Sequence, residues 1–246
     1  MNPADHQDVS VAILAGGLGT RLRPALADRP KVLAPVAGRP FIGYLLDQLA
    51  RAGLREVVLL VGYCADQVQA ALGEQYAGVQ LRYSVEPSPQ GTAGAVRLAL
   101  PLLTRSRLLL LNGDSYCDAD LGELLRQHVQ SALPVSMTLA QVADSSRFGR
   151  VELAQDGRVC QFVEKGREAR PGWINAGIYL LDRSLLETMP ATVPLALEWD
   201  VLPSWVTAGL VRGHCCSGSF LDIGTPESYA GAEAFLRLGA WNSERK

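Results

Sequence analysis

A glycine-rich segment near the N-terminus carries the residue types that bind phosphate. An apolar run, Val11 to Leu14, ends in a turn, and small or cationic residues follow at Gly16, Gly17, Gly19, Thr20, Arg21, Arg23 and Lys31. Glycines let backbone N–H groups approach an anion closely, and consecutive exposed N–H groups form a concave anion site. Guanidinium groups add donors in a fixed fork, and an ammonium adds a compact charge. This chemistry predicts a polyphosphate-binding loop after a first β-strand, and a turn that needs glycine only to change direction is the simpler alternative.

The spacing of these residues differs from that of two common nucleotide-binding loops. The dinucleotide fingerprint of oxidoreductases needs a third glycine at the position of Leu22. The P-loop needs Gly-Lys followed by Ser or Thr, whereas this chain has Gly19-Thr20-Arg21. A dinucleotide-dependent oxidoreductase is therefore disfavoured, and a thermal-shift measurement with NAD would test it.

The segment instead follows the pattern GGxGTRLRP, and a Pro-Lys pair, Pro30-Lys31, comes shortly after it. This combination resembles the signature of the sugar-1-phosphate nucleotidyltransferases, also called nucleotide-sugar pyrophosphorylases. The resemblance extends from Val11 to about Leu238, and further motifs occur in the order typical of the family. It implies that a nucleoside triphosphate is bound by Leu14, Ala15, Gly16, Gly17, Gly19, Thr20, Arg21 and Lys31.

Apolar runs alternate with amphipathic segments through the first half of the chain. We expect strands at 11–14, 56–62, 79–85 and 107–111, a short extended piece at 32–36, and helices from Arg39-Pro40 to Gly53, at 65–72 and at 93–103. Continuous apolar strands such as EVVLLVG are typical of a parallel sheet covered on both faces. The alternation predicts an α/β fold with a doubly wound, mostly parallel, Rossmann-like sheet.

The second half has a different pattern. We expect helices at 121–129, 184–188, 198–208 and 226–238, strands at 135–142, 177–181, 210–215 and 219–222, and a hairpin at 150–162 that turns at Asp156-Gly157. No linker-like run or internal repeat divides the chain. We therefore expect a loose tail at residues 1–10 and a single domain at 11–246. Its nucleotide-binding half would span about 11–118, and a smaller sugar-binding lobe of hairpin and late strands about 119–246.

The composition argues against several classes of function. The chain has 246 residues, of which 48% are hydrophobic and 20% charged, as is ordinary for a globular domain. With a net charge of −2 it lacks an overall basic field for nucleic acid or an anionic membrane. No apolar run approaches the ~20 residues that span a bilayer. Its cysteines show no metal-binding spacing, so we expect free thiols in a reducing cytoplasm. The sequence leaves open whether the chain forms a homo-oligomer.

Two aspartates are candidate metal ligands. Asp114 follows a buried strand within Asn112-Gly113-Asp114, and ligands of open α/β sheets gather at the carboxyl ends of strands. Magnesium prefers hard oxygen donors such as carboxylates. A surface turn would also explain Asn-Gly-Asp, and a helix start at Thr225-Pro226 would explain much of the region around Asp222. The resemblance implies that Asp114 and Asp222, the latter within FLDIGTPESY, together hold Mg²⁺.

A second glycine-containing loop, EPSPQGTAGA at residues 86–95, leads into a helix. Glycine permits the close approach of a flat ligand, and Thr92 is suited to cap the helix; an ordinary helix entry is the alternative. The resemblance implies that this loop contacts the nucleobase through its backbone and through Glu86 or Gln90, with Gly91 and Thr92 alongside. Many members of the family have leucine where Gln90 stands, so this chain departs from their pattern.

The resemblance also implies a sugar-phosphate site in the second half of the chain. In the family a glutamate contacts sugar hydroxyls and a lysine neutralises the phosphate, and these roles pass to Glu164 and Lys165. Further residues that it places at the sugar are Asn112, Gly113, Asn175, Gly177 and Glu198. A solvated charged turn would equally explain Glu164-Lys165, and an amphipathic helix would explain Glu198.

The implied reaction transfers a nucleoside monophosphate from a nucleoside triphosphate to a sugar 1-phosphate and releases pyrophosphate. Because a phosphate monoester is already ionised near neutral pH, no general base is needed, and catalysis consists of positioning and charge stabilisation. The catalytic candidates are Arg21, Lys31, Asp114 and Lys165, with Mg²⁺ as cofactor. Segments such as EWDVLP look most like those of guanylyltransferases for D-glycero-α-D-manno-heptose 1-phosphate, so GTP and that sugar are the expected substrates.

Other substrates and one other class of function stay open. Mannose 1-phosphate guanylyltransferases share the scaffold, as do uridylyltransferases and thymidylyltransferases for hexose or N-acetylmuramate 1-phosphates. A regulatory module that binds a nucleotide sugar without catalysis is the alternative from another class. Nucleotide binding without turnover would support that alternative.

Overall fold

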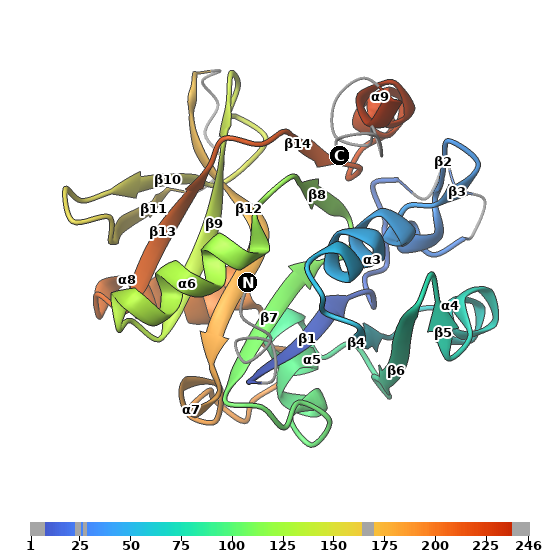
Figure 1. Cartoon of the computed structure of the whole chain (residues 1–246), viewed down its shortest axis with the longest axis horizontal. Helices are drawn as coiled ribbons and strands as arrows, with labels where there is room; N and C mark the ends of the chain where they lie inside the picture. The colour runs from blue at the N-terminus through green and yellow to red at the C-terminus, as the bar shows by residue number, and fades with distance from the viewer. Residues whose placement is uncertain (1–7, 23–25, 27–28, 164–169, 238–246) are drawn as a thin grey trace.

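Strand β1, Val9–Leu14, lies at the centre of the sheet between two neighbours that run parallel to it, β4 (Glu56–Val61) and β7 (Arg107–Asn112). The structure is a computed structural model that describes residues 8–22, 26, 29–163 and 170–237. All three strands are apolar runs buried along most of their length, which is the pattern of strands covered on both faces. The α/β class predicted from the sequence is confirmed (Figure 1).

The remaining elements follow in chain order. The other strands are β2 (Pro35–Val36), β3 (Arg39–Pro40), β5 (Gln75–Tyr76), β6 (Val79–Val85), β8 (Ser115–Cys117), β9 (Val135–Val142), β10 (Arg150–Leu153), β11 (Val159–Val163), β12 (Gly172–Asp182), β13 (Val211–Cys216) and β14 (Phe220–Asp222). The α-helices are α3 (Ile42–Arg51), α4 (Ala65–Leu72), α5 (Thr92–Ala99), α6 (Leu121–Ser131), α7 (Arg183–Leu186), α8 (Leu202–Thr207) and α9 (Pro226–Phe235). A 3₁₀ turn, η1 (Lys31–Leu33), and a π-helical turn, η2 (Leu197–Val201), complete the described elements.

The sheet is mainly parallel in its first half and mixed in its second. Strand β6 continues the parallel arrangement beyond β4, and the short β5 pairs antiparallel with β6 at that edge. On the other side of β1, strand β12 pairs antiparallel with β7, and β9 pairs antiparallel with β12. Strand β13 then runs parallel to β9, and the β10–β11 hairpin joins β12. The β10–β11 hairpin and strands β9, β12 and β13 thus form one side of the sheet, seen on the left of Figure 1, whereas the late strand β14 pairs with β8 outside this group.

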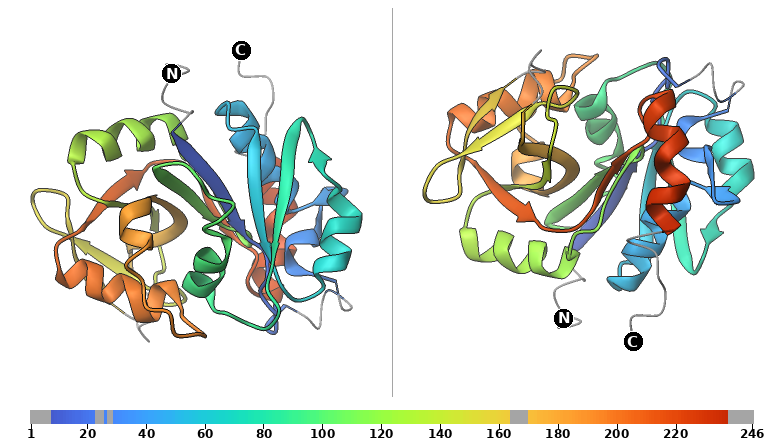
Figure 2. Two further views of the ribbon diagram at one scale, coloured as in Figure 1. Left: turned by 90° about the horizontal axis from the view of Figure 1, so that it is seen from below. Right: turned by 90° about the horizontal axis from the view of Figure 1, so that it is seen from above.

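Helices cover both faces of the sheet, as Figure 2 shows. Successive side chains of a strand point to opposite faces, so β1 contributes to two separate cores. On one face, Val11 and Ile13 pack in a core that includes buried residues of α3, α4 and α6. On the other face, Ala12 packs in a core that includes buried residues of α5, α7 and α8. This is the doubly wound arrangement.

The structure corrects several expected boundaries near the N-terminus. Strand β1 begins at Val9, so Val9 and Ser10 belong to the sheet and not to a loose tail. The expected extended piece at 32–36 is the turn η1 followed by β2, because the N–H groups of Leu33 and Ala34 bond to carbonyls three residues back. The expected helix opening at Arg39-Pro40 is strand β3, which pairs with β2.

The helix starts later than expected because a tight hairpin comes before it. Ala37 and Gly38, between the two strands, both have positive φ, at 49° and 81°. Such a turn suits an antiparallel pair, so Pro40 completes the hairpin and the helix starts only at Ile42. Expected bounds at 65–72, 79–85 and 135–142 agree with the structure.

The end of the described chain returns to the first half of the molecule. Strand β14 pairs antiparallel with β8, a strand that the sequence did not predict. Helix α9 follows, and its Tyr229 hydroxyl donates a hydrogen bond to the carbonyl oxygen of Pro35 at 2.7 Å. Residues far apart in the chain therefore meet at the carboxyl edge of the central strands. None of the described helices is long and apolar enough to cross a membrane.

Candidate functional site

The loops that follow β1 and β7 begin side by side. Leu14, the last residue of β1, is in register with Asn112, the last residue of β7. The backbone N–H of Gly113 donates a hydrogen bond to the carbonyl oxygen of Leu14 at 2.9 Å. Because parallel strands end at the same edge of a sheet, the glycine-rich loop and Asp114 face one space.

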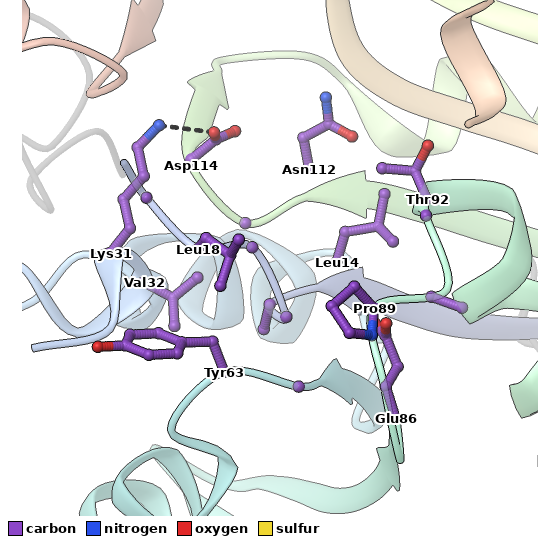
Figure 3. Close-up of a pocket in the computed structure, with 18 of the residues that line it drawn as sticks. Leu14, Leu18, Lys31, Val32, Tyr63, Glu86, Pro89, Thr92, Asn112 and Asp114 are labelled. Carbon is purple, nitrogen blue, oxygen red and sulfur yellow. Dashed lines mark hydrogen bonds and ion pairs between the residues drawn. The ribbon is translucent and has the colours of Figure 1, made fainter. Parts of the chain in front are cut away.

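That space is a cavity of about 660 Å³, named the first cavity below. Its walls are the glycine-rich loop after β1, the loop between β6 and α5, and the turn after β7. The residues predicted from the sequence that line it are Leu14, Ala15, Gly16, Gly17, Gly19, Thr20, Arg21, Lys31, Glu86, Gly91, Thr92, Asn112, Gly113, Asp114 and Glu198. Figure 3 shows this cavity, with Glu86, Pro89 and Thr92 on the side away from Lys31.

An ion pair borders the first cavity. Lys31 Nζ donates to Asp114 Oδ2 at 2.7 Å, the dashed line in Figure 3. The Lys31 side chain is only 11% exposed, whereas that of Asp114 is 40% exposed. Val32 and Leu33, which follow Lys31 in η1, are buried in the core and fix the backbone of this turn. The ammonium group is therefore held at the wall of the cavity before any anion binds.

Glu86 and Gln90 occupy different positions relative to the first cavity. Glu86 lines the cavity, and burial raises the pKa of its carboxyl group despite a hydrogen bond from the Gln90 backbone N–H to Oε2 at 2.8 Å. A Cβ atom on Gly16 would lie 2.7 Å from Glu86 Oε1, so glycine at this position makes room for the carboxylate. The Gln90 side chain does not line the cavity, because its amide donates to Ser88.

A second cavity of about 280 Å³ adjoins the first, and both are lined by Arg21, Asn112, Asp114 and Glu198. The predicted residues that line only the second cavity are Asn175, Gly177 and Asp222. Gly177 has a φ of +75°, and a Cβ atom there would lie 2.8 Å from Asn112 Nδ2 and from Ser115 Oγ. Only glycine suits this conformation and this close approach.

Glu198 is fixed at the boundary between the two cavities by hydrogen bonds. Its Oε2 accepts from the Thr92 hydroxyl at 3.1 Å, and its Oε1 accepts from the Tyr179 hydroxyl at 3.4 Å. Asn175 Nδ2 donates to the same Tyr179 oxygen at 2.6 Å. Burial, and then the negative charge of Glu198, raise the pKa of Tyr179 well above its usual value. Tyr179 therefore stays a neutral donor that holds the Glu198 carboxylate in place.

Asp222 reaches the site through the pairing of β14 with β8. It lies opposite Ser115, and the N–H of Ile223 donates to the carbonyl oxygen of Asp114 at 3.0 Å. Its Oδ1 accepts from the Gly224 N–H at 3.0 Å. Burial, followed by the nearby charge of Asp114, raises the pKa of Asp222, and Lys31 partly opposes this. The structure thus brings together the two aspartates predicted to bind metal.

Two residues predicted to bind the sugar and its phosphate, Glu164 and Lys165, lie outside the described residues. Within the described ranges, no group of three or more His, Cys, Asp and Glu side chains could hold a metal ion. An ion between Asp114 and Asp222 would therefore need oxygen ligands from substrate or water as well.

Residues 10–238 match the family described as Nucleotidyl transferase. The chain belongs to this family. The family resemblance and the nucleotidyltransferase class expected from the sequence are thereby confirmed.

Several guanylyltransferases are similar to this nucleotidyltransferase. The D-glycero-alpha-D-manno-heptose 1-phosphate guanylyltransferase of Aneurinibacillus thermoaerophilus is 31% identical over 92% of this chain and 97% of its own length. The mannose-1-phosphate guanylyltransferase of Mycobacterium tuberculosis is 34% identical over 96% of this chain, which spans 66% of that relative. The crystal structure of HddC from Yersinia pseudotuberculosis has a TM-score of 0.83 and 31% identity, covering 92% of this chain and 99% of that one. HddC complexed with GMP-PN gives a TM-score of 0.82.

Sequence reasoning missed part of the wall of the second cavity in this nucleotidyltransferase. The residues not predicted include Ser115, Arg147, Phe148, Phe162, Trp199 and Phe220. They come from β8, β11, β14, η2 and the loop between β9 and β10, so no single motif groups them. The only local signal is the basic and aromatic pair Arg147-Phe148 beside Gly149 in a loop.

Proposed function

We propose that the chain transfers a guanylyl group from GTP to a sugar 1-phosphate and releases pyrophosphate. The observation that carries this proposal is the meeting of two cavities at Arg21, Asn112, Asp114 and Glu198. The larger cavity has the glycine-rich loop and Lys31 for a triphosphate, and the smaller has polar groups for a sugar. A transfer reaction needs its two substrates side by side with the reacting atoms at the boundary.

The cationic side chains would supply most of the catalysis. Arg21 and Lys31 would stabilise the charge that develops on the triphosphate as pyrophosphate leaves. The acceptor phosphate is already an anion near neutral pH, so it can attack the α-phosphorus in line without a general base. Lys165, by its resemblance to the family lysine, would hold that acceptor phosphate.

Glu86 supports GTP as the donor. An ionised carboxylate only accepts hydrogen bonds, and the edge of guanine presents two adjacent donors, N1–H and N2–H₂. Uracil and thymine present one N–H between two carbonyl oxygens, and a carboxylate repels those oxygens. Since Glu86 lines the larger cavity beside Gly16, its carboxylate is placed to favour guanine. The names of the heptose and mannose relatives agree with this base.

The sugar is best taken as D-glycero-α-D-manno-heptose 1-phosphate. The heptose enzyme of A. thermoaerophilus and HddC match this chain over nearly their full length, whereas the M. tuberculosis mannose enzyme is longer. Mannose 1-phosphate is the second candidate, because that enzyme is 34% identical over 239 residues. Both sugars share the manno configuration, so Asn175 and Glu198 could serve either in the smaller cavity.

Asp114 and Asp222 fit a magnesium ion. Both are oxygen donors of the kind that Mg²⁺ prefers, both line the second cavity, and their mutual repulsion contributes to the raised pKa of Asp222. A bound divalent cation would relieve that repulsion and add positive charge near the reacting phosphates.

We also place the enzyme in the cytoplasm, because all five cysteines are free thiols.

The test is a matrix of nucleoside triphosphates and sugar 1-phosphates, scored by pyrophosphate release. It would combine GTP, UTP, dTTP and ATP with heptose, mannose, glucose and N-acetylmuramate 1-phosphates in the presence of Mg²⁺. We expect the highest kcat/KM for GTP with the heptose compound. Turnover of GTP with mannose 1-phosphate alone would select the second candidate, and binding of GTP without turnover of any pair would indicate a non-catalytic module.

A further inference from the structure

Arg147 lies in the loop between β9 and β10, on the wall of the second cavity. Its side chain is 45% exposed, and the guanidinium carbon lies 5.6 Å from the centre of the Phe148 ring. Phe148 in turn packs edge-on against Phe220 of β14, with ring centres 5.6 Å apart. The aromatic pair holds the loop against the sheet, so the guanidinium is held at the cavity.

The contacts of Arg147 use only part of its hydrogen-bonding capacity. All three pass through Nη2, which donates to Thr225 Oγ1 at 3.2 Å and to Asp222 Oδ1 and Ser228 Oγ at 3.5 Å each. These distances exceed the 2.7–2.9 Å of strong charge-assisted bonds. Within the described ranges of the chain, Nε and Nη1 have no acceptor. The N–H groups on Nε and Nη1 are therefore available to a ligand.

The charges around the second cavity explain which ligand would use those donors. Asp114, Glu198 and Asp222 line it with carboxylates, which repel an acceptor that carries a phosphate. A phosphate monoester has a charge of about −1.5 to −2 near neutral pH, so it needs cations on this side. Among the described cations, Arg21 is shared with the first cavity and Lys31 is paired with Asp114, whereas Arg147 lines only the second cavity. Lys165, proposed above for the same phosphate, lies outside the described residues.

We infer that Arg147 binds the phosphate group of the sugar 1-phosphate acceptor through the N–H groups of Nε or Nη1, which are not used in the contacts with Asp222, Thr225 and Ser228. The inference rests on the proposed function and names a residue that recognises the acceptor. A guanidinium presents its N–H donors in fixed directions, whereas an ammonium is a compact point charge on a flexible stem. The contact therefore orients the acceptor phosphate as well as neutralising it.

The alternative is that Arg147 only ties the loop to the start of α9. Loss of the side chain would then lower stability and change both substrates' kinetics together. A phosphate-binding role instead changes the KM of the acceptor and leaves the KM of the triphosphate nearly unchanged. Because Arg147 also contacts Asp222, a change in kcat fits both roles, and only the separation of the two KM values decides between them.

The experiment compares wild type with Arg147→Ala, Arg147→Lys and a matched control, Arg158→Ala. Arg158 lies in the same lobe, is 52% exposed, pairs with Asp156 and lines neither cavity. With the substrate pair that wild type turns over, we expect Arg147→Ala to raise the KM for the sugar 1-phosphate roughly 10- to 100-fold. Arg147→Lys should give an intermediate value, and Arg158→Ala should resemble wild type. Equal changes in both KM values, or none in the acceptor's, would overturn the inference.

A binding measurement keeps the test separate from the proposed reaction. Calorimetry with mannose 1-phosphate and with mannose measures the part of the affinity that depends on phosphate. We expect wild type to prefer the phosphate by at least tenfold and Arg147→Ala to lose most of that preference. This result would stand even if no substrate pair were turned over, in which case only the proposed reaction would fail. No preference for mannose 1-phosphate in wild type would overturn the role of Arg147.

Discussion

Lys31 Nζ lies 2.7 Å from Asp114 Oδ2, although 83 residues separate the two in the chain. The pair joins the turn after the glycine-rich loop to the turn after β7. Asp114 holds the ammonium in place at the cavity wall, so little rearrangement is needed when a phosphate arrives. Such preorganised charge is the main way in which an active site lowers the free energy of a charged transition state.

Replacing Lys31 by alanine should mainly reduce kcat. Removal of one well-placed electrostatic donor costs on the order of 3 kcal/mol, or roughly a hundredfold in rate. Pyrophosphate release at saturating substrates measures the effect. Arg55→Ala serves as the control, because Arg55 is an exposed cation that lines neither cavity. Full turnover in Lys31→Ala would remove the lysine from the catalytic residues.

Replacing Asp222 by asparagine should abolish most of the activity while raising the melting temperature near neutral pH without metal. The folded-state pKa of Asp222 is raised, by burial first and then by Asp114. A raised pKa means that the folded state favours the protonated form of Asp222. The contribution of this group to the free energy of unfolding is therefore fully present below its usual pKa of 3.8 and is lost as the pH rises through its folded-state pKa. Asparagine removes that loss, and each kcal/mol regained adds roughly 2–4 °C to Tm.

The pH dependence and a control variant test this linkage. The difference in Tm between Asp222→Asn and wild type should disappear at acid pH and grow towards neutral pH. Asp156→Asn should change stability in the opposite direction, because backbone and side-chain hydrogen bonds from Arg158 lower the pKa of Asp156. Added Mg²⁺ should raise the Tm of wild type more than that of Asp222→Asn. A destabilised Asp222→Asn at neutral pH would contradict the assigned cause of the shift.

Gly177→Ala should impair both folding and acceptor binding. A positive φ in a residue with a side chain costs roughly 1–2 kcal/mol, and the new Cβ would also press on Asn112 and Ser115 at the second cavity. The matched variant is Gly157→Ala in the hairpin turn, where φ is +81° and the atom nearest to a new Cβ is the side-chain Nη2 of Arg212, at 3.4 Å. Both variants should lower Tm, but only Gly177→Ala should raise the KM for the sugar 1-phosphate.

Glu86→Gln should weaken the preference for GTP over UTP. The amide keeps the size of the carboxylate but replaces one acceptor oxygen with a donor group, so one hydrogen bond to guanine is lost and repulsion of uracil is relieved. We expect the ratio of kcat/KM values for the two nucleotides to fall by roughly tenfold or more. The ratio is measured by competition between GTP and UTP. An unchanged ratio would place base recognition elsewhere in the loop.

Much of the fold could be predicted because local patterns specify it. Apolar runs and helical spacing predicted 65–72, 79–85 and 135–142 with the observed bounds. The region 32–40 could not be predicted, since its 3₁₀ turn and hairpin depend on the burial of Val32 and Leu33 and on the turn at Ala37-Gly38. Strand β8 was missed because its partner β14 lies about a hundred residues further along the chain.

For the site, the sequence by itself determined the chemistry of the glycine-rich loop and, through resemblance to a family, the roles of Lys31, Asp114 and Asp222. Only the tertiary structure decided that Lys31 pairs with Asp114, that Gln90 turns towards Ser88, and that Arg147 faces the second cavity. Residue types and spacing specify contacts between near neighbours in the chain. Contacts between distant residues depend instead on strand pairing, such as that of β14 with β8, which no local stretch of sequence encodes.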